Sequence, residues 1–265
     1  MVSAPILVFD SGVGGLSVHA AIAAQLPGET YVYACDNAAF PYGPKPEDEL
    51  VERVHAVLDA LIARFQPKLL VVACNTASTV ALPRLRQHYT LPIVGVVPAI
   101  KPAAAISRNR VIGLLATPGT IRRAYTDQLI RDFADDCAIV RIGSADLVQI
   151  AEHKLRQGRV DIDALRELLQ PFFAHTPAVD TVVLGCTHFP LLREELQQAS
   201  PGVVNWVDSG AAIAARVGYL LGATTTPIKT DAQNVAAFTR RDSEANALRP
   251  ALHERGFAKI EFLDV

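Results

Sequence analysis

The feature that most constrains the fold of this chain is a regular alternation of short apolar runs with longer amphipathic stretches. The runs are rich in Val, Ile and Leu without strict alternation, which is typical of strands buried on both faces. Strands that alternate with helices indicate βαβ units, so we expect an α/β fold with mainly parallel sheets. The runs are Pro5–Phe9, Tyr31–Cys35, Leu69–Ala73, Ile93–Val97, Val111–Ala116, Ala138–Ile142, Thr181–Gly185 and Val203–Val207.

One of the stretches between these runs, Glu47–Phe65, shows clear helical spacing. Its apolar residues recur at intervals of three and four and so share one face, which predicts an amphipathic helix packed on a sheet. They are Leu50, Val54, Val57, Leu58, Leu61, Ile62 and Phe65.

An internal repeat carries more information than any single element. Leu70–Thr76 reads LVVACNT, and Val182–His188 reads VVLGCTH. Upstream of each lies another strand that ends in a polar turn, at Leu7–Gly12 and at Leu114–Gly119. The repeat predicts two similar three-layer α/β domains related by a pseudo-twofold repeat, with a cleft between them. Because ligands bind at the carboxyl ends of strands in open α/β sheets, we expect the active site in that cleft.

The same patterns suggest where the domains begin and end. We expect residues 1–97 and 208–265 to form the first α/β domain and residues 98–207 to form the second. Ser209–Leu221 predicts a capped helix, and Ala223–Pro227 a loop. A final apolar run, Ile260–Leu263, is expected to return to the first domain as an edge strand.

Composition and charge exclude several classes of function. Of the 265 residues 50% are hydrophobic, and the net charge is −2 without a basic segment, so no nucleic-acid partner is expected. No window approaches the roughly 18 apolar residues that span a membrane. The N-terminus lacks the pattern of a signal peptide, which predicts a cytoplasmic protein whose thiols stay reduced.

The segment Asp10–Gly15, read DSGVGG, follows a predicted strand. It does not fit a dinucleotide fingerprint, since Ser17 stands where the last glycine belongs, and no Gly-Lys-Ser/Thr follows for a P-loop. Its glycines either let backbone N–H groups approach an anion or form a tight turn without a ligand. Gly12 replaces the second aspartate of a phosphotransfer site, which leaves Asp10 as a helix cap or as a carboxylate beside another reacting group.

Two of the four cysteines stand out. Cys35 and Cys137 are read as inert small hydrophobes. Cys74 and Cys186 each end an apolar run and precede hydrogen-bonding residues at an expected helix start, where a thiolate is stabilised. Each alone would favour the inert interpretation, but their repetition in one context favours chemistry.

Metal binding is the rival use of such a pair. Asp10, Cys74, Cys186 and His188 could supply four ligands in principle. However, His188 lies only two positions from Cys186, and the sequence has no C-x-x-C and no second clustered pair. We therefore expect no metal site.

Four blocks of sequence in order resemble a known family. Asp10–Leu16 reads DSGVGGL, Pro41–Gly43 reads PYG, Ala73–Ala77 reads ACNTA and Gly185–His188 reads GCTH. Together they resemble the signature of bacterial glutamate racemases, within the aspartate/glutamate racemase superfamily. The Asp-Ser-Gly start with Pro-Tyr-Gly is what points to glutamate.

This resemblance implies interconversion of L- and D-glutamate without a cofactor, which supplies the D-enantiomer for peptidoglycan. Racemisation removes the α-proton from one face and returns a proton to the other, so two opposed acid/base groups are the simple solution. The resemblance gives these roles to Cys74 and Cys186. The expected partner is the small-molecule substrate glutamate, with a homodimer as a further expectation.

The resemblance also implies roles for several neighbours of these cysteines. Ser11 and the backbone of Tyr42 and Gly43 would receive the substrate, including its side-chain carboxylate. Asp10 would support Cys74 and take part in binding. His188 would support Cys186, with Glu152 as an auxiliary group that polarises the imidazole.

Hydroxyl and amide groups next to the cysteines suit the remaining task. Without a cofactor, the developing carbanion must be stabilised by prearranged hydrogen bonds and by exclusion of water. The candidates for holding the α-carboxylate or the amino group can equally serve as helix caps. They are Asn75, Thr76 and Thr187, assisted from the second domain by Thr117 and Thr120.

Three alternatives stay open from the sequence. The same reaction could act on aspartate or on another amino acid. The chain could be a non-catalytic protein that binds a small molecule. It could also be a thiol redox enzyme, which would form a reversible disulfide.

Overall fold

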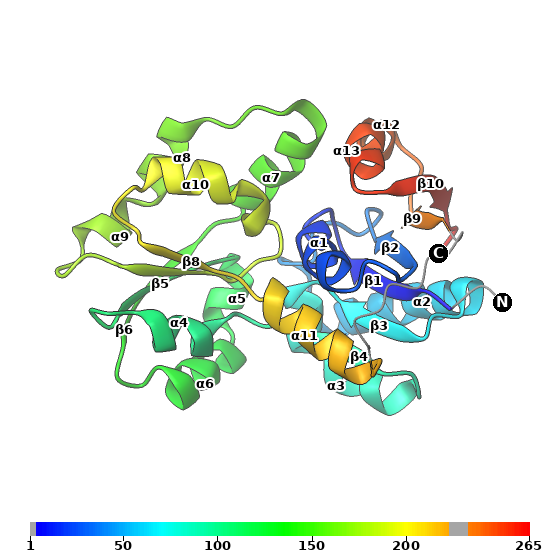
Figure 1. Cartoon of the computed structure of the whole chain (residues 1–265), viewed down its shortest axis with the longest axis horizontal. Helices are drawn as coiled ribbons and strands as arrows, with labels where there is room; N and C mark the ends of the chain where they lie inside the picture. The colour runs from blue at the N-terminus through cyan, green and yellow to red at the C-terminus, as the bar shows by residue number, and fades with distance from the viewer. Residues whose placement is uncertain (1–3, 223–232) are drawn as a thin grey trace. The chain divides into compact units, whose positions relative to one another are not determined.

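The computed structural model describes residues 4–222 and 233–265, and the loop expected at Ala223–Pro227 lies outside them. The chain divides into two compact units (Figure 1). Unit 1 comprises Met1–Val96 and Gly210–Val265, and unit 2 comprises Val97–Ser209. No helix in the described part of the chain is long and apolar enough to cross a membrane.

Unit 1 contains a six-stranded sheet in the order β10-β9-β2-β1-β3-β4, and all neighbouring strands are parallel. The two central strands are buried along their whole length, as continuous apolar runs predict. The strands are β1 (Ile6–Asp10), β2 (Tyr31–Cys35), β3 (Leu69–Val72), β4 (Ile93–Gly95), β9 (Asn234–Phe238) and β10 (Phe257–Phe262).

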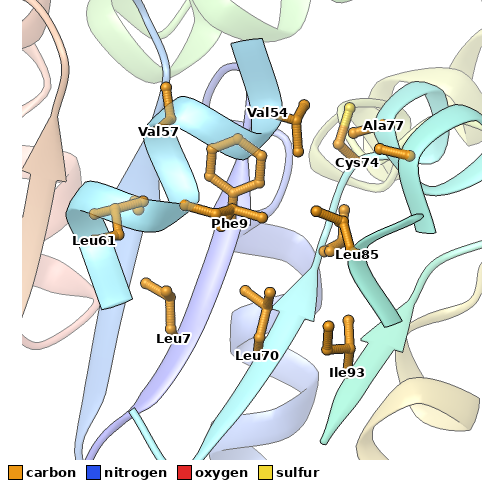
Figure 2. Close-up of a cluster of buried hydrophobic side chains, with 14 of the residues drawn as sticks. Leu7, Phe9, Val54, Val57, Leu61, Leu70, Cys74, Ala77, Leu85 and Ile93 are labelled. Carbon is orange, nitrogen blue, oxygen red and sulfur yellow. The ribbon is translucent and has the colours of Figure 1, made fainter. Parts of the chain in front are cut away.

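Helices cover both faces of this sheet. Leu7 and Phe9 of β1 point into an apolar cluster with α2 and α3 (Figure 2). Val32 of β2 pairs with Leu7, so the neighbouring Tyr31 points to the other face, where it contacts His19 of α1. Cys74 lies at one end of the cluster in Figure 2, beside Ala77. The helices are α1 (Leu16–Gln25), α2 (Glu47–Phe65), α3 (Asn75–His88), α11 (Gly210–Leu220), α12 (Ser243–Ala247) and α13 (Arg249–Glu254).

Unit 2 contains a four-stranded parallel sheet in the order β6-β5-β7-β8. Ile112 and Leu114 of β5 pack with α4 and α6 on one face. On the other face the ring of Phe172 lies over Gly113, where an added Cβ would come within 2.8 Å of the ring. The strands are β5 (Val111–Ala116), β6 (Ala138–Gly143), β7 (Thr181–Leu184) and β8 (Asn205–Val207).

Short helices complete unit 2, most of them of two turns or less. They connect the parallel strands by crossovers, as the βαβ pattern requires. They are α4 (Ile100–Ile106), α5 (Pro118–Arg122), α6 (Ala124–Phe133), α7 (Asp146–Gln157), α8 (Ile162–Leu168), α9 (Gln170–Ala174), the 3₁₀ helix η1 (Phe189–Leu192) and α10 (Arg193–Ala199).

The strand orders confirm the internal repeat, because β2-β1-β3-β4 of unit 1 matches β6-β5-β7-β8 of unit 2. The hydrogen bonds also set its register. Ala73 N donates to Phe9 O, and Gly185 N donates to Leu115 O, both at 2.7 Å. Ser11 is therefore equivalent to Thr117, one position away from the alignment that the sequence suggested. Side chains alternate between the two faces of a strand, so the pairing of strands defines the equivalent residues without ambiguity. The similarity of two short turns in the sequence does not.

Two details differ from the sequence prediction. Strand β9 was not expected, because Asn234–Phe238 is short and half its apolar residues are small. It lies between β2 and β10, so that β10 is the edge strand. The last run of unit 2 is shorter than predicted, since β8 begins at Asn205 and Val204 is 70% exposed.

Candidate active site

Cys74 lies at the carboxyl end of the unit 1 sheet, where β3 gives way to a helix. It is the N-cap residue of α3, with an extended backbone at φ −134° and ψ 117°. Asn75 and Thr76 form the first turn of α3 and are each 5% exposed. The first N–H groups of a helix lack intrahelical partners and carry partial positive charge, so this position favours an anion on or near the sulfur.

The turn after β1 brings a hydroxyl group to Cys74. Ser11 Oγ lies 3.8 Å from Cys74 Sγ. Asp10 is fully buried, and its carboxylate accepts hydrogen bonds from Ser11 N at 2.6 Å and from Gly15 N at 2.5 Å. The aspartate therefore holds the backbone of the turn that carries Ser11. It is not the N-cap of α1, which is Gly15.

Gly15 is required by the same turn. An added Cβ there would lie 2.9 Å from the Cβ of Asp10 and 3.0 Å from that of Ala73. Tyr33 of β2 also holds the turn, since its hydroxyl donates to Gly12 O at 2.5 Å. The turn is thus packed closely against Asp10 at the end of β1 and Ala73 after β3, and the Tyr33 hydroxyl of β2 holds its backbone.

Tyr42 is held in place by a buried charged cluster. Its hydroxyl donates to Asp36 Oδ2 at 2.6 Å. Arg53 donates to both oxygens of Asp36, at 2.6 and 2.9 Å, and the Thr239 hydroxyl donates at 2.6 Å. Burial alone would raise the pKa of Asp36, but the hydrogen bonds from Arg53, Thr239 and Tyr42 hold it below its ordinary value. Burial and the adjacent Asp36 raise the pKa of Tyr42, so its hydroxyl remains a donor, and the half-buried Gly43 follows it.

Cys186 occupies the equivalent strand end in unit 2, but its local structure differs from the prediction. The turn Cys186–His188 leads into η1, whose N-cap is His188, and α10 begins only at Arg193. The expected helix start is therefore wrong, because Pro190 and the short η1 come between the cysteine and the α-helix. Cys186 and Thr187 are buried, with 7% and 5% exposed.

A chain of polar contacts leads away from Cys186 into the interior of unit 2. His188 Nδ1 lies 3.8 Å from Cys186 Sγ, and its Nε2 lies 2.8 Å from Glu152 Oε1 on α7. Arg156, one turn further along α7, donates to Glu152 Oε2 at 2.6 Å. Burial alone would lower the pKa of His188, but its hydrogen bonds with Cys186 and Glu152 hold it well above the ordinary value. This direction favours the protonated form of the imidazole beside the Cys186 sulfur.

Thr117 and Thr120 meet at the end of the neighbouring strand β5. The Thr117 side chain caps α5 by accepting from Thr120 N at 3.3 Å, and their hydroxyls lie 3.0 Å apart. Thr120 is fully buried, whereas Thr117 is half-buried. Thr117 therefore caps α5, and its hydroxyl is also held by that of Thr120.

The structure brings the predicted residues into two groups, one in each unit. Unit 1 gathers the turn after β1 and the start of α3, and unit 2 gathers the turn after β7, α7 and the start of α5. The first group comprises Asp10, Ser11, Cys74, Asn75 and Thr76, and the second comprises Thr117, Thr120, Glu152, Cys186, Thr187 and His188.

Sequence reasoning missed the residues that hold these groups in place. Asp36 follows β2 directly, so a buried carboxylate at a strand end was a detectable signal. Arg156 stands four positions after Glu152, the helical spacing at which such side chains meet. Arg53 and Thr239 gave no signal, since only tertiary folding brings them to Asp36.

The cysteines and carboxylates do not form a metal site within residues 4–222 and 233–265. No group of three or more His, Cys, Asp or Glu side chains there is arranged to hold a metal ion. None of the four cysteines, all of which the structure describes, forms a disulfide.

A model of the Asp/Glu/hydantoin racemase family matches residues 14–217. The glutamate racemase of Escherichia coli O139:H28 (strain E24377A / ETEC) is 52% identical over 260 residues, which cover 98% of this chain and 91% of the relative. The glutamate racemase of Yersinia enterocolitica is 50% identical over 259 residues, with 98% and 90% covered.

Solved structures agree with these matches. The crystal structure of Escherichia coli glutamate racemase in complex with L-glutamate and the activator UDP-MurNAc-Ala has a TM-score of 0.93 at 50% identity, with 98% of both chains covered. Glutamate racemase RacE1 of Bacillus anthracis has a TM-score of 0.85 at 26% identity, with 100% of this chain and 99% of that chain covered. The repeated α/β units with a thiol at one strand end of each define an isomerase of the amino-acid racemase class. The chain belongs to the Asp/Glu/hydantoin racemase family and, within it, to the glutamate racemases.

Proposed function

We propose that the chain interconverts L- and D-glutamate by moving the α-proton between two cysteines, Cys74 and Cys186. The observation that carries this proposal is a buried thiol, outside any disulfide, at the equivalent strand end of each repeated unit. In the proposed reaction, one cysteine acts as a thiolate and takes the α-proton from one face of the substrate carbon. The other acts as a thiol and donates its proton to the opposite face, after which the two have exchanged protonation states.

The surroundings of each cysteine suit these roles. The charged imidazole of His188 stabilises a thiolate at Cys186, and it can return a proton through Nδ1 at 3.8 Å. At Cys74 the N-terminus of α3 favours negative charge, and the Ser11 hydroxyl offers a neutral hydrogen bond. Cys74 and Cys186 are both buried, and burial strengthens each of these interactions.

The α-proton of an amino acid is far less acidic than a thiol, so the carbanion must be stabilised. We propose that this is done without a cofactor, by hydrogen bonds from Asn75, Thr76 and Thr187 to the α-carboxylate and amino groups. Thr117 and Thr120 assist from the end of β5. Their hydroxyls are already fixed by capping and by each other, so they need little reorganisation when charge develops.

The substrate proposal rests on the relatives and on the turns of unit 1. The relatives at 50–52% identity are glutamate racemases by name, and one solved relative holds L-glutamate. In the proposal, Ser11 and the backbone at Tyr42 and Gly43 receive the side-chain carboxylate. The Asp36 cluster supports this site by fixing Tyr42.

The cellular role follows from the proposed product. D-Glutamate would supply peptidoglycan synthesis, and a mechanism that needs two reduced thiols fits the cytoplasm. The solved relative from Escherichia coli also holds the activator UDP-MurNAc-Ala. We propose that the same compound raises the activity of this chain, which ties its output to the cell-wall precursors that consume it.

The test is to incubate the purified protein with L-glutamate in heavy water without added cofactor. The expected result is loss of optical rotation together with deuterium at the α-carbon of the newly formed D-glutamate. A parallel assay with aspartate separates the two amino acids, and faster turnover of aspartate would overturn the substrate assignment. If neither amino acid gained α-deuterium, the result would favour a non-catalytic protein that binds a small molecule. Loss of activity on adding a reductant would favour the redox alternative.

A further inference from the structure

The chain of contacts behind Cys186 does not end at Glu152. The two oxygens of the Glu152 carboxylate have different partners: Oε1 lies 2.8 Å from His188 Nε2, and Oε2 accepts from Arg156 Nη1 at 2.6 Å. The same Nη1 also donates to the Glu152 carbonyl oxygen at 2.8 Å. Arg156 thereby fixes both the backbone and the side chain of Glu152, and so the direction in which Oε1 points.

This contact differs from an ordinary surface pair on a helix. The side chains of Arg156 and Glu152 are 16% and 7% exposed, respectively. Exposed pairs four residues apart contribute little and are screened by salt. A pair this buried is held in one geometry, since breaking it would leave a carboxylate buried with one partner fewer.

Building on the proposed function, we propose that Arg156 is a positioning residue for the Cys186 half of the reaction. It holds the Glu152 carboxylate against His188 Nε2, which fixes the ring so that Nδ1 faces the Cys186 sulfur. A carboxylate on one ring nitrogen determines which nitrogen serves the reacting group. Arg156 acts only through this relay and does not touch the reacting atoms.

A control substitution is needed to separate the positioning role of Arg156 from the general effect of removing a charge, and unit 2 offers two other basic residues for comparison. Lys154, on the same helix, pairs with Glu195 of α10 and donates to Leu191 O, which pins η1 to α7. Substitution there would move the backbone after His188, so Lys154 is a poor control. Arg166 of α8 forms an exposed pair with Asp163. Its substitution is therefore the matched control, because it also removes one arginine from unit 2.

The experiment compares Arg156→Gln, Arg156→Lys and Arg166→Gln in racemisation of glutamate. We expect Arg156→Gln to lower kcat about tenfold with little change in KM, because misplacement of a catalytic group slows the reaction more than binding. Arg156→Lys keeps a positive charge, and because Nη1 alone makes both contacts with Glu152, a single ammonium can replace it. This variant should remain within about threefold of the unsubstituted protein. Arg166→Gln should leave both constants unchanged.

A spectroscopic measurement separates positioning from general loss of structure. The Nε2 proton of His188, donated to a carboxylate at 2.8 Å, should give a strongly downfield proton resonance. This resonance should be assigned by its loss in Glu152→Gln. It should move upfield or broaden in Arg156→Gln and persist in Arg156→Lys and Arg166→Gln.

Three results would overturn the inference while leaving the proposed function intact. The first is a kcat of Arg156→Gln within twofold of the unsubstituted protein, and the second is a kcat of Arg156→Lys as low as that of Arg156→Gln. The third is an unchanged His188 Nε2 resonance in Arg156→Gln. Failure of the unsubstituted protein to racemise glutamate would instead refute the proposed function.

Discussion

The two units end their equivalent strands in a cysteine, yet they surround it differently. Cys74 caps an α-helix and has a neutral hydroxyl as neighbour, Ser11. Cys186 precedes a 3₁₀ turn and lies beside an imidazole that is tied to a carboxylate. In the proposed mechanism, a thiolate at Cys74 would be stabilised by the N-terminus of α3, and one at Cys186 by the pair of His188 and Glu152. The comparison shows that a repeated fold can place two thiols at equivalent positions in different polar surroundings.

The largest expected effect comes from removing either thiol. Cys74→Ala and Cys186→Ala should each lower racemisation by about 10³-fold or more, because each removes the proton carrier of one face. Each variant should still exchange the α-proton of the single enantiomer that the remaining cysteine serves. The measurement is proton exchange in heavy water with each enantiomer, alongside circular dichroism to show that the fold is intact. If either variant retained near-normal turnover, the two-thiol assignment would be wrong.

The buried histidines of the two units provide a second contrast. His19 of unit 1 is 2% exposed, and neither ring nitrogen has a hydrogen-bond partner among the described residues. Burial, aided by Arg255, lowers the pKa of His19 to about 4, whereas the pKa of His188 is raised. The unfolded chain therefore binds a proton at His19 near pH 6.5, and the native protein binds it only near pH 4.

As pH falls from about 6.5 to about 4, protonation of His19 in the unfolded chain should reduce the free energy of unfolding. The loss should reach about 3 kcal/mol at pH 4, at 1.36 kcal/mol for each pH unit. His19→Leu keeps an apolar side chain between Tyr31 and Phe257 and should remove this dependence. Urea unfolding at pH 7 and pH 4.5 measures it, and parallel losses in both proteins would contradict the assignment.

The third effect tests whether the two cysteines depend unequally on their neighbours. His188→Asn should lower kcat about 10²-fold, since it removes a charged acid/base group next to Cys186. Ser11→Ala removes only a neutral hydroxyl at 3.8 Å from Cys74 and should lower kcat several-fold. Steady-state rates in both directions provide the comparison. Equal losses would mean that the two strand ends work alike.

The smallest effect concerns the packing that brings β1 and β3 together. Gly15→Ala should reduce the free energy of unfolding by about 2 kcal/mol, because its Cβ would meet those of Asp10 and Ala73 at 3.0 Å or less. Gly202→Ala is the control, since no atom lies within 4 Å of a Cβ there. Urea titration measures both, and a Gly15 variant as stable as the control would show that the turn adjusts freely.

Much of the fold could be predicted because parallel strands leave long apolar runs. The strands with Val-rich cores, such as Leu69–Val72 and Thr181–Leu184, were predicted within a residue or two. Strand β9 escaped because Ala236 and Ala237 give a weak apolar signal, although both are buried in the sheet. Its place depends on β2, whose Val32 pairs with Val235 about two hundred positions later in the sequence.

The candidate site was predictable to a similar extent. Cysteines and polar residues at strand ends are visible in the sequence, because chemistry needs those side chains at those places. The relay from Cys186 through His188 to Glu152 was foreseen in outline, but its continuation to Arg156 was not. Supporting residues such as Arg53 carry no local signature, since tertiary contacts alone give them a role.

The return of the chain's last segment to unit 1 affects how the protein can be made. Unit 2 is one continuous stretch, Val97–Ser209, so it can fold as soon as that stretch has left the ribosome. The larger sheet must wait for Asn234–Phe238, which lies between β2 and β10. During synthesis the outer edge of β2 therefore stays unpaired until Asn234–Phe238 has emerged, and an unpaired strand edge is open to mispairing with other chains.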